Sequence, residues 1–122
     1  MSLFERIGSN LVEQSMNAQS LRQRKIAENI ANINTPGYTA QRVRFENLLL
    51  ERQRQSKMLH TNEKHLPVMK DVEAKVVDTG KDVVLDEETG ELAKVQLFFA
   101  MESTNLSRRL KMLREAISGQ IK

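Results

Sequence analysis

The first third of the chain carries apolar residues at spacings of three, four and seven, which is the pattern of one helix face. This stripe consists of Leu3, Phe4, Ile7, Leu11, Ala18 and Leu21. Beyond it the same positions turn polar, and Ile26, Ile30 and Ile33 fall on a face rotated by about 100°. The pattern predicts a helix over residues 1–34 that meets at least two partners along its length. The alternative is an ordinary break in the helix near residues 22–25.

The last third shows a second helical pattern, with the period of a coiled coil. Asp86 is the expected N-cap residue, and carboxylates follow it in the first turns, where negative charge suits the helix dipole. We therefore predict a helix over residues 86–121. Gln96 and Ser103 interrupt its apolar seam, and Val95 lies off the seam. The residues of this C-terminal seam are Leu92, Phe99, Leu106, Leu110, Leu113 and Ile117.

A chain reversal is predicted just after the first helix. Pro36 disfavours the helical region for Thr35, and Gly37 can take the positive φ that a type II turn needs. The first helix must therefore stop by about Asn34, a residue that tolerates the left-handed conformation common past a helix end. Tyr38 follows the turn directly.

Two asparagines precede this turn. Asn29 and Asn32 lie one helical turn apart on a single face, although asparagine is a poor helix former compared with alanine. Their amides can cap the end of the helix or bond the backbone of the turn. They can also bond across an interface between subunits. The residue pattern leaves both interpretations open.

The middle of the chain carries weaker patterns. Residues 38–46 alternate in polarity and predict a short extended segment, and residues 47–58 predict a brief helix. Alternation returns at residues 74–76 and 83–85, with turn residues between them. These residues are predicted to form either a small hairpin or two extended pieces around a turn.

These patterns predict one fold class. At 122 residues the chain has room for a single domain, and its apolar residues concentrate near the two ends. We expect a mainly α fold, with long N- and C-terminal helices forming an elongated hairpin or coiled-coil-like bundle. A short irregular or small-β middle would join them. The expected divisions of residues 1–122 are 1–34, 35–85 and 86–121.

Composition excludes several kinds of chemistry. The chain has no cysteine, so disulfides and cysteine-bound metals are excluded. It shows no phosphate-binding glycine loop and no nucleophile elbow. His60 and His65 flank Glu63, but their spacing of five is not that of a helical pair of metal ligands, and solvated histidines are the simpler interpretation. We expect no enzyme activity, no cofactor and no metal site.

Charge leaves one alternative function. The net charge of +3 and the pI of about 9.4 fit a small basic helical nucleic-acid-binding protein, but the aromatic residues form no stacking platform. The chain is basic up to residue 70, acidic over residues 71–91 and basic again after them. This order of charges could steer copies into a staggered contact. The alternative is that the charged side chains are simply solvated. No stretch approaches the roughly 20 apolar residues of a membrane span, and no cleavable secretory signal is visible.

The helix end and the turn together resemble the signature of flagellar basal-body rod proteins. Ile33 and Asn34 are its variable pair, and the stretch 83–97 is similar to the start of that family's final helix, with departures at Val84 and Gly90. The residues that carry the signature are Asn29, Ile30, Ala31, Asn32, Thr35, Pro36, Gly37 and Tyr38.

The resemblance implies a structural subunit of the proximal rod that self-assembles through its terminal helices and transmits torque. Another short type of rod protein is the alternative. The implied partners are its own copies, other rod subunits, the MS ring, the rod-base adaptor and the flagellar export apparatus. It would reach the periplasmic rod without a cleavable signal and without inserting into a membrane. The expected subunit packing residues are those of the C-terminal seam together with Ile7, Leu11, Leu21, Ile26 and Ile33.

The division of apolar surface between several faces predicts that the terminal helices are loosely ordered in the dilute monomer. They become firm when neighbouring copies cover their other faces. Circular dichroism and amide hydrogen exchange at increasing protein concentration measure this. Full helicity and strong protection of both ends in the dilute monomer would contradict the prediction.

Overall fold

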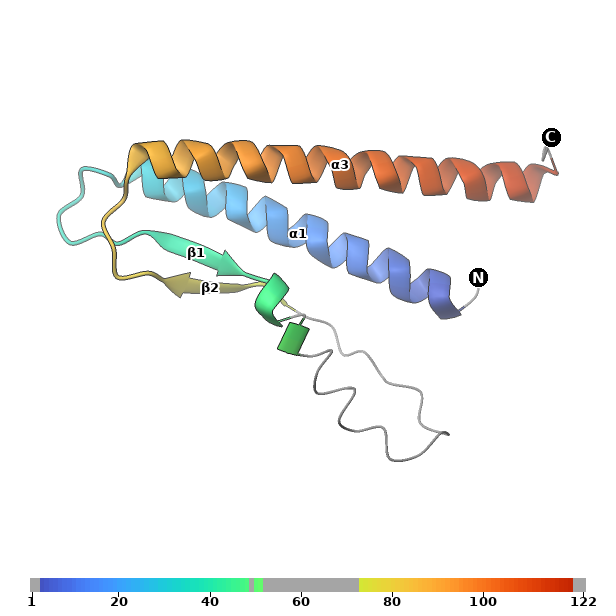
Figure 1. Cartoon of the computed structure of the whole chain (residues 1–122), viewed down its shortest axis with the longest axis horizontal. Helices are drawn as coiled ribbons and strands as arrows, with labels where there is room; N and C mark the ends of the chain where they lie inside the picture. Colours follow the sequence, from blue (N-terminus) through green and yellow to red (C-terminus); the bar gives the residue numbers. More distant parts are fainter. Residues whose placement is uncertain (1–2, 49, 52–72, 120–122) are drawn as a thin grey trace, which may run out of the picture.

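A computed structural model describes residues 3–48, 50–51 and 73–119, with the backbone alone for residues 3–9. The order of elements is helix α1 (Leu3–Ala31), strand β1 (Gln41–Arg44), strand β2 (Lys75–Asp78) and helix α3 (Leu85–Ser118). The two helices run antiparallel and lie closest where α1 ends and α3 begins, and the two strands lie beside them (Figure 1). The expected mainly α fold with a small β middle is confirmed. We call the end where the helices meet the closed end.

Helix α1 ends in a tightened turn. The amide of Asn32 donates to the carbonyls of Glu28 and Asn29, both at 3.1 Å, and the amide of Ile33 donates to Ile30 at 3.3 Å. The expectation of a left-handed residue at Asn34 is wrong, because none of the described residues other than glycine has a positive φ. Tighter backbone bonds satisfy the helix end instead.

The reversal after α1 has the geometry that the sequence predicts. Gly37 has a φ of 75°, and the amide of Tyr38 donates to the carbonyl of Thr35 at 3.2 Å. A side chain at this φ would be strained, so glycine suits the position. The turn sends the chain back along α1 toward β1.

Of the two alternatives for residues 74–76 and 83–85, the hairpin is wrong. β2 pairs antiparallel with β1, in a register that runs from Gln41 opposite Asp78 to Arg44 opposite Lys75. Val84 has an extended backbone, with φ −112° and ψ 118°, and it directly precedes α3. The alternation near residue 84 therefore reflects the extended approach to a helix and not a strand. A partner strand distant in sequence leaves no trace in the local pattern.

The start of α3 also differs from its prediction. Val84 is the N-cap residue and makes no side-chain capping bond, whereas Asp86, the expected cap, lies in the first turn. The acidic residues of this turn still face the positive end of the helix dipole. Residues 46–48 and 50–51 are helical, and the rest of the helix expected to residue 58 lies outside the described residues.

The core is small and is centred between the middle of α1 and the segment that follows β1. Ala18 of α1 packs with Phe45, which follows β1, and Leu11, Leu48 and Ala74 cover them partly. The other buried apolar side chains of the described residues are Ile26, Ala40, Val43 and Val95. Residues 107–118 of α3 are exposed on every face.

Phe45 is 4% exposed, so its truncation leaves a cavity in this core. We expect Phe45→Ala to lower the free energy of unfolding by about 3–5 kcal/mol. Phe98→Ala is the matched control, because Phe98 is 51% exposed and its truncation should cost less than about 1 kcal/mol. Urea denaturation of the monomer, followed by circular dichroism, measures both. Equal losses at the two positions would contradict this placement of the core.

Candidate functional site

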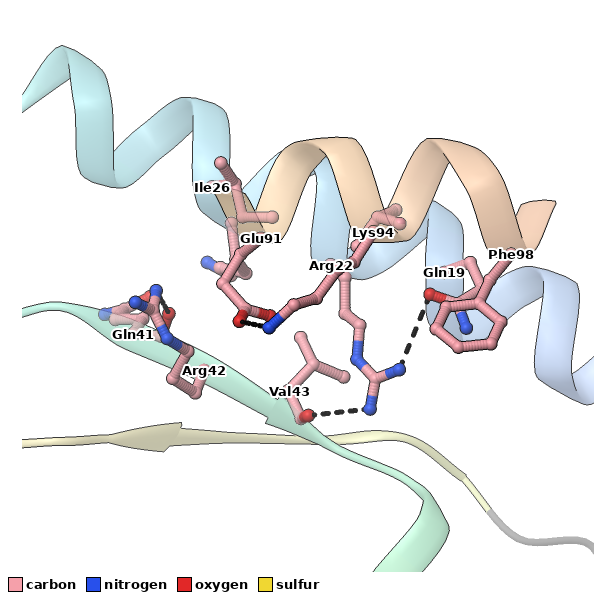
Figure 2. Close-up of a pocket in the computed structure, with 11 residues that line it drawn as sticks. Gln19, Arg22, Ile26, Gln41, Arg42, Val43, Glu91, Lys94 and Phe98 are labelled. Carbon is pink, nitrogen blue, oxygen red and sulfur yellow. Dashed lines mark hydrogen bonds and ion pairs between the residues drawn. The ribbon is translucent and has the colours of Figure 1, made fainter. Parts of the chain in front are cut away.

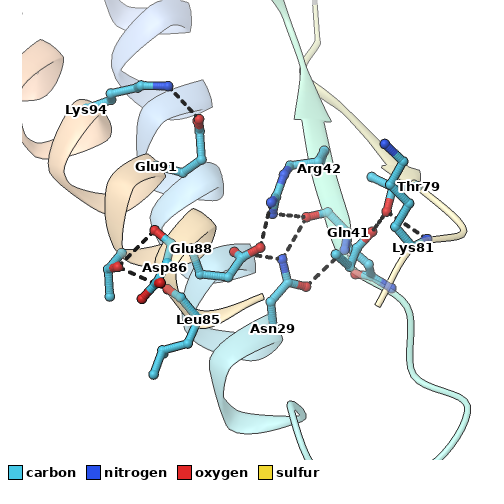
Figure 3. A network of polar contacts seen from close by, with 12 residues as sticks. Asn29, Gln41, Arg42, Thr79, Lys81, Leu85, Asp86, Glu88, Glu91 and Lys94 are labelled. Atoms are coloured by element: carbon cyan, nitrogen blue, oxygen red, sulfur yellow. Dashed lines mark hydrogen bonds and ion pairs between the residues drawn. The ribbon is translucent and has the colours of Figure 1, made fainter. Parts of the chain in front are cut away.

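A fully buried amide joins the elements of the closed end. Asn29 of α1 is 0% exposed, and its Nδ2 donates to the carbonyl of Gln41 at 3.0 Å and to Oε2 of Glu88 at 3.1 Å. Its Oδ1 accepts from the amide of Gln41 at 2.9 Å and from the hydroxyl of Tyr38 at 3.1 Å. A side-chain amide has two donor hydrogens and two acceptor lone pairs, so the hydrogen-bonding capacity of Asn29 is filled (Figure 3).

A charge pair extends this network to β1 and α3. Glu88 is 0% exposed, and its Oε1 lies 2.6 Å from Nη2 of Arg42. The short distance between the two opposite charges defines this contact as an ion pair. The side-chain contact with Glu88 and then its charge raise the pKa of Arg42 above its ordinary value, against the opposing effect of burial. Removing one partner of a buried pair leaves an uncompensated charge, which costs about 3–5 kcal/mol.

We call Asn29, Tyr38, Gln41, Arg42 and Glu88 the Asn29 cluster. Its members come from the end of α1, the turn, β1 and the first turn of α3, so the cluster fixes the mutual positions of all four segments. A second polar contact lies farther along the helices, where the Ser15 hydroxyl donates to Oε1 of Glu102. The two contacts are separated equally along each helix, so they specify the same antiparallel register.

Asn32 completes the end of α1 instead of joining the cluster. Its Nδ2 donates to the carbonyl of Glu28 at 2.8 Å, and its Oδ1 accepts from the Thr35 hydroxyl at 3.2 Å. Both asparagines therefore bond groups of their own chain, at the helix end and at the backbone after the turn. Ala31 and the turn residues 35–37 are exposed, and Ile30 is half-buried.

Sequence reasoning did not find the partners of Asn29. It treated Glu88 only as one of the carboxylates at a helix start, and Arg42 only as one of the basic residues before residue 70. Both assignments followed from local charge, and no local pattern connects residues that lie 59 positions apart, as Asn29 and Glu88 do. The only available signal was the unfavourable asparagine itself, which indicated a polar contact without naming the partner.

The expected subunit packing residues divide into covered and uncovered ones. Ile26 is buried within its own chain, and Leu11 and Leu21 are half-buried. Val95, which lies off the C-terminal seam, is buried, while Leu92 and Leu106 of the seam are half-buried. The side chain of Ile7 lies outside the described part. The uncovered residues of the set are Ile33, Phe99, Leu110, Leu113 and Ile117.

A groove of about 230 Å³ runs between α1, β1 and α3 (Figure 2). Ile26, Val43 and Val95 contribute apolar surface, and Phe98 lines one part of it. The cations that line the groove are each paired with a carboxylate, which leaves them little capacity to bind a free anion. The pairs are Arg22 with Glu46, Lys25 with Glu28, Arg42 with Glu88 and Lys94 with Glu91.

The described residues include no group of three or more His, Cys, Asp or Glu side chains arranged to hold a metal ion. His60, Glu63 and His65 lie outside this part of the chain. Neither of the two long helices has a stretch apolar and long enough to cross a membrane.

Comparison with known proteins shows which class of protein this chain resembles. The family model described as flagella basal body rod protein matches residues 13–39, which contain Asn29, the helix end and the turn. Over this stretch the chain is similar to the flagellar basal body rod proteins. The chain is also similar to the flagellar basal body rod protein FlgB of Bacillus subtilis (strain 168), with 27% identity over 128 residues, covering 98% of both chains.

Together these matches support an FlgB-like rod protein, as the sequence predicts. The matches also support a structural role in the flagellar basal body rod, with other rod components as partners.

The Asn29 cluster predicts a sharp response to exchanging amide and carboxylate. Asn29→Asp places a carboxylate against Glu88 and the Gln41 carbonyl, and we expect a loss of about 3–5 kcal/mol in the free energy of unfolding. Adding Glu88→Gln removes the like charge and supplies a donor, so stability should recover in part. Recovery stays incomplete because the Gln41 carbonyl still lacks its donor and because Arg42 loses the carboxylate of Glu88. Urea denaturation measures all three chains.

Asn34→Asp is the matched control for this exchange, because Asn34 is exposed beside the same helix end. We expect it to change stability by less than about 0.5 kcal/mol. Equal effects of Asn29→Asp and Asn34→Asp, or no recovery on adding Glu88→Gln, would contradict the described network.

Proposed function

We propose that this rod subunit assembles with neighbouring subunits through the surfaces of α3 that its own chain leaves uncovered. The observation that carries the proposal is the exposure of large apolar side chains along the whole length of that helix. Leu97 is 61% exposed and Ile117 is 86% exposed. Large apolar side chains that stay exposed to this extent mark an interaction site. The other exposed large apolar residues of α3 beyond its first turn are Phe98, Phe99, Met101, Leu110, Met112 and Leu113.

The same arrangement supports a role in transmitting torque. A shaft transmits torque only if its subunits do not slip past one another, and long helices packed side by side supply many parallel contacts. The Asn29 cluster holds α1 and α3 in one register, so the chain presents its uncovered faces in a fixed relation. A single rod-type domain of this kind needs no catalytic group.

The resemblance to rod proteins extends the proposal to particular partners. Copies of the chain and other rod subunits would cover the α3 face, and the MS ring and the rod-base adaptor would lie next to the assembly. Delivery to the periplasmic rod would use the flagellar export apparatus. These assignments rest on family likeness, while the α3 face rests on exposure.

The proposal predicts that the middle of α3 is needed for assembly but not for folding. Leu97 and Met101 lie one turn apart on the same helix face, and both are more than half exposed. We expect Leu97→Asn with Met101→Asn to leave the unfolding midpoint of the monomer nearly unchanged. In cells that lack the natural protein, this variant should reduce assembled basal bodies about tenfold or more, the effect of losing about 1.4 kcal/mol of contact free energy.

Thr104→Asn is the matched control, since Thr104 is exposed on α3 and already polar. It should support normal swimming. Basal bodies counted by electron microscopy, together with swimming in soft agar, provide the measurement. Normal assembly by the double variant would show that this face is not used.

A further inference from the structure

The far end of α3 presents an uncovered face of definite character. Leu110, Leu113 and Ile117 lie within about 60° of one another around the helix, at about 100° per residue, and all three are exposed. Arg109 and Arg114 flank this stripe on its two sides. We call residues 107–118 the free end of α3. It combines an apolar stripe with a basic border.

The closed end of the molecule carries the complementary surface. Ile33, Val84 and Leu85 are exposed apolar residues at the end of α1 and the start of α3. The contact of Asn29 with Glu88 holds those two segments together. Exposed carboxylates border these apolar residues along the α3 side, at Asp82, Asp86 and Glu87. The closed end thus combines an apolar patch with an acidic border.

The two surfaces of one molecule cannot meet each other. α3 is one helix of 34 residues, which spans about 50 Å at about 1.5 Å per residue, with the two surfaces at its opposite ends. Only a second copy can bring an acidic closed end to a basic free end. Apolar patches with opposite charges around them attract across such an interface, and like ends repel.

We propose that the free end of α3 docks on the closed end of the next copy, so that subunits stack head to tail. This inference rests on the proposed function and deepens it by naming the two surfaces and the direction of growth. A contact between two different surfaces leaves one of each uncovered at the ends of every complex, so the assembly stays open and can grow. An antiparallel pair of α3 helices would also match opposite charges, but it closes on itself after two copies.

Cysteine crosslinking distinguishes these arrangements, because the natural chain has no cysteine. Leu85→Cys with Ile117→Cys, oxidised at high protein concentration, should give a ladder of dimers, trimers and longer products under denaturing conditions. A mixture of the two single variants should give mainly heterodimers. Leu85→Cys with Ala100→Cys is the matched control and should give no ladder, because Ala100 lies exposed in the middle of α3.

A product that stops at the dimer would overturn the head-to-tail proposal in favour of the closed pair. A ladder of equal strength from the Ala100 control would overturn it in favour of lateral packing alone. Absence of any crosslinked product at high concentration would also overturn it. The rod function is tested separately from this contact. If no crosslinked ladder forms but cells that carry the chain still build normal basal bodies, the head-to-tail proposal is wrong and the rod function is supported.

Charge reversal tests the same contact independently. Asp86→Lys with Glu87→Lys makes both ends basic, and Arg109→Glu with Arg114→Glu makes both ends acidic. On the Leu85→Cys, Ile117→Cys background, each charge variant alone should form the ladder about tenfold more slowly or worse, and an equal mixture of the two should restore it. Failure of the mixture to recover would show that charge does not direct the contact.

Discussion

The structure depends on one buried amide whose donors and acceptors are all used. Oδ1 of Asn29 accepts hydrogen bonds from the Tyr38 hydroxyl and the Gln41 amide. Its Nδ2 donates to the Gln41 carbonyl and to Glu88. An apolar side chain in its place would leave these groups buried without partners, and an aspartate would lack both donors. The cost of asparagine within a helix is modest by comparison, at less than about 1 kcal/mol relative to alanine. The position therefore requires a side-chain amide of this length.

This constraint explains why the helix end and the turn act as one unit. Tyr38 and Gln41 lie 9 and 12 residues after Asn29, and they return to it only because Gly37 adopts a positive φ. Asn32 satisfies the carbonyl of Glu28 at the place where the helix stops, which keeps the exit direction of the chain constant. Each residue type in this stretch meets a separate geometric need, and the family model matches the part of the chain that contains all of them.

The sequence predicted what is locally encoded and failed where partners are distant. The two long helices and the turn follow from apolar spacing and from Pro36 and Gly37, which act within a few residues. The pairing of β1 with β2 joins segments about thirty residues apart, so alternation alone connected the wrong pieces. The N-cap was misplaced because an acidic residue suits the first turn as well as the cap. Glu88 looked like one more charge at a helix start, although it is fully buried.

Burial at one end and exposure at the other give the molecule a direction. The Asn29 cluster lies where α1 ends and α3 begins, and the Ala18–Phe45 core lies farther back along α1, so this part of the molecule has packing of its own. The far part of α3 has little of its own chain to pack against, and a helix in water gains most of its stability from packing rather than from propensity. A subunit with a packed closed end and an exposed free end of α3 is suited to open assembly. The closed end of one copy can order the free end of the next copy. The Asn29 cluster then contributes to assembly indirectly, because it gives the closed end the same structure in every subunit.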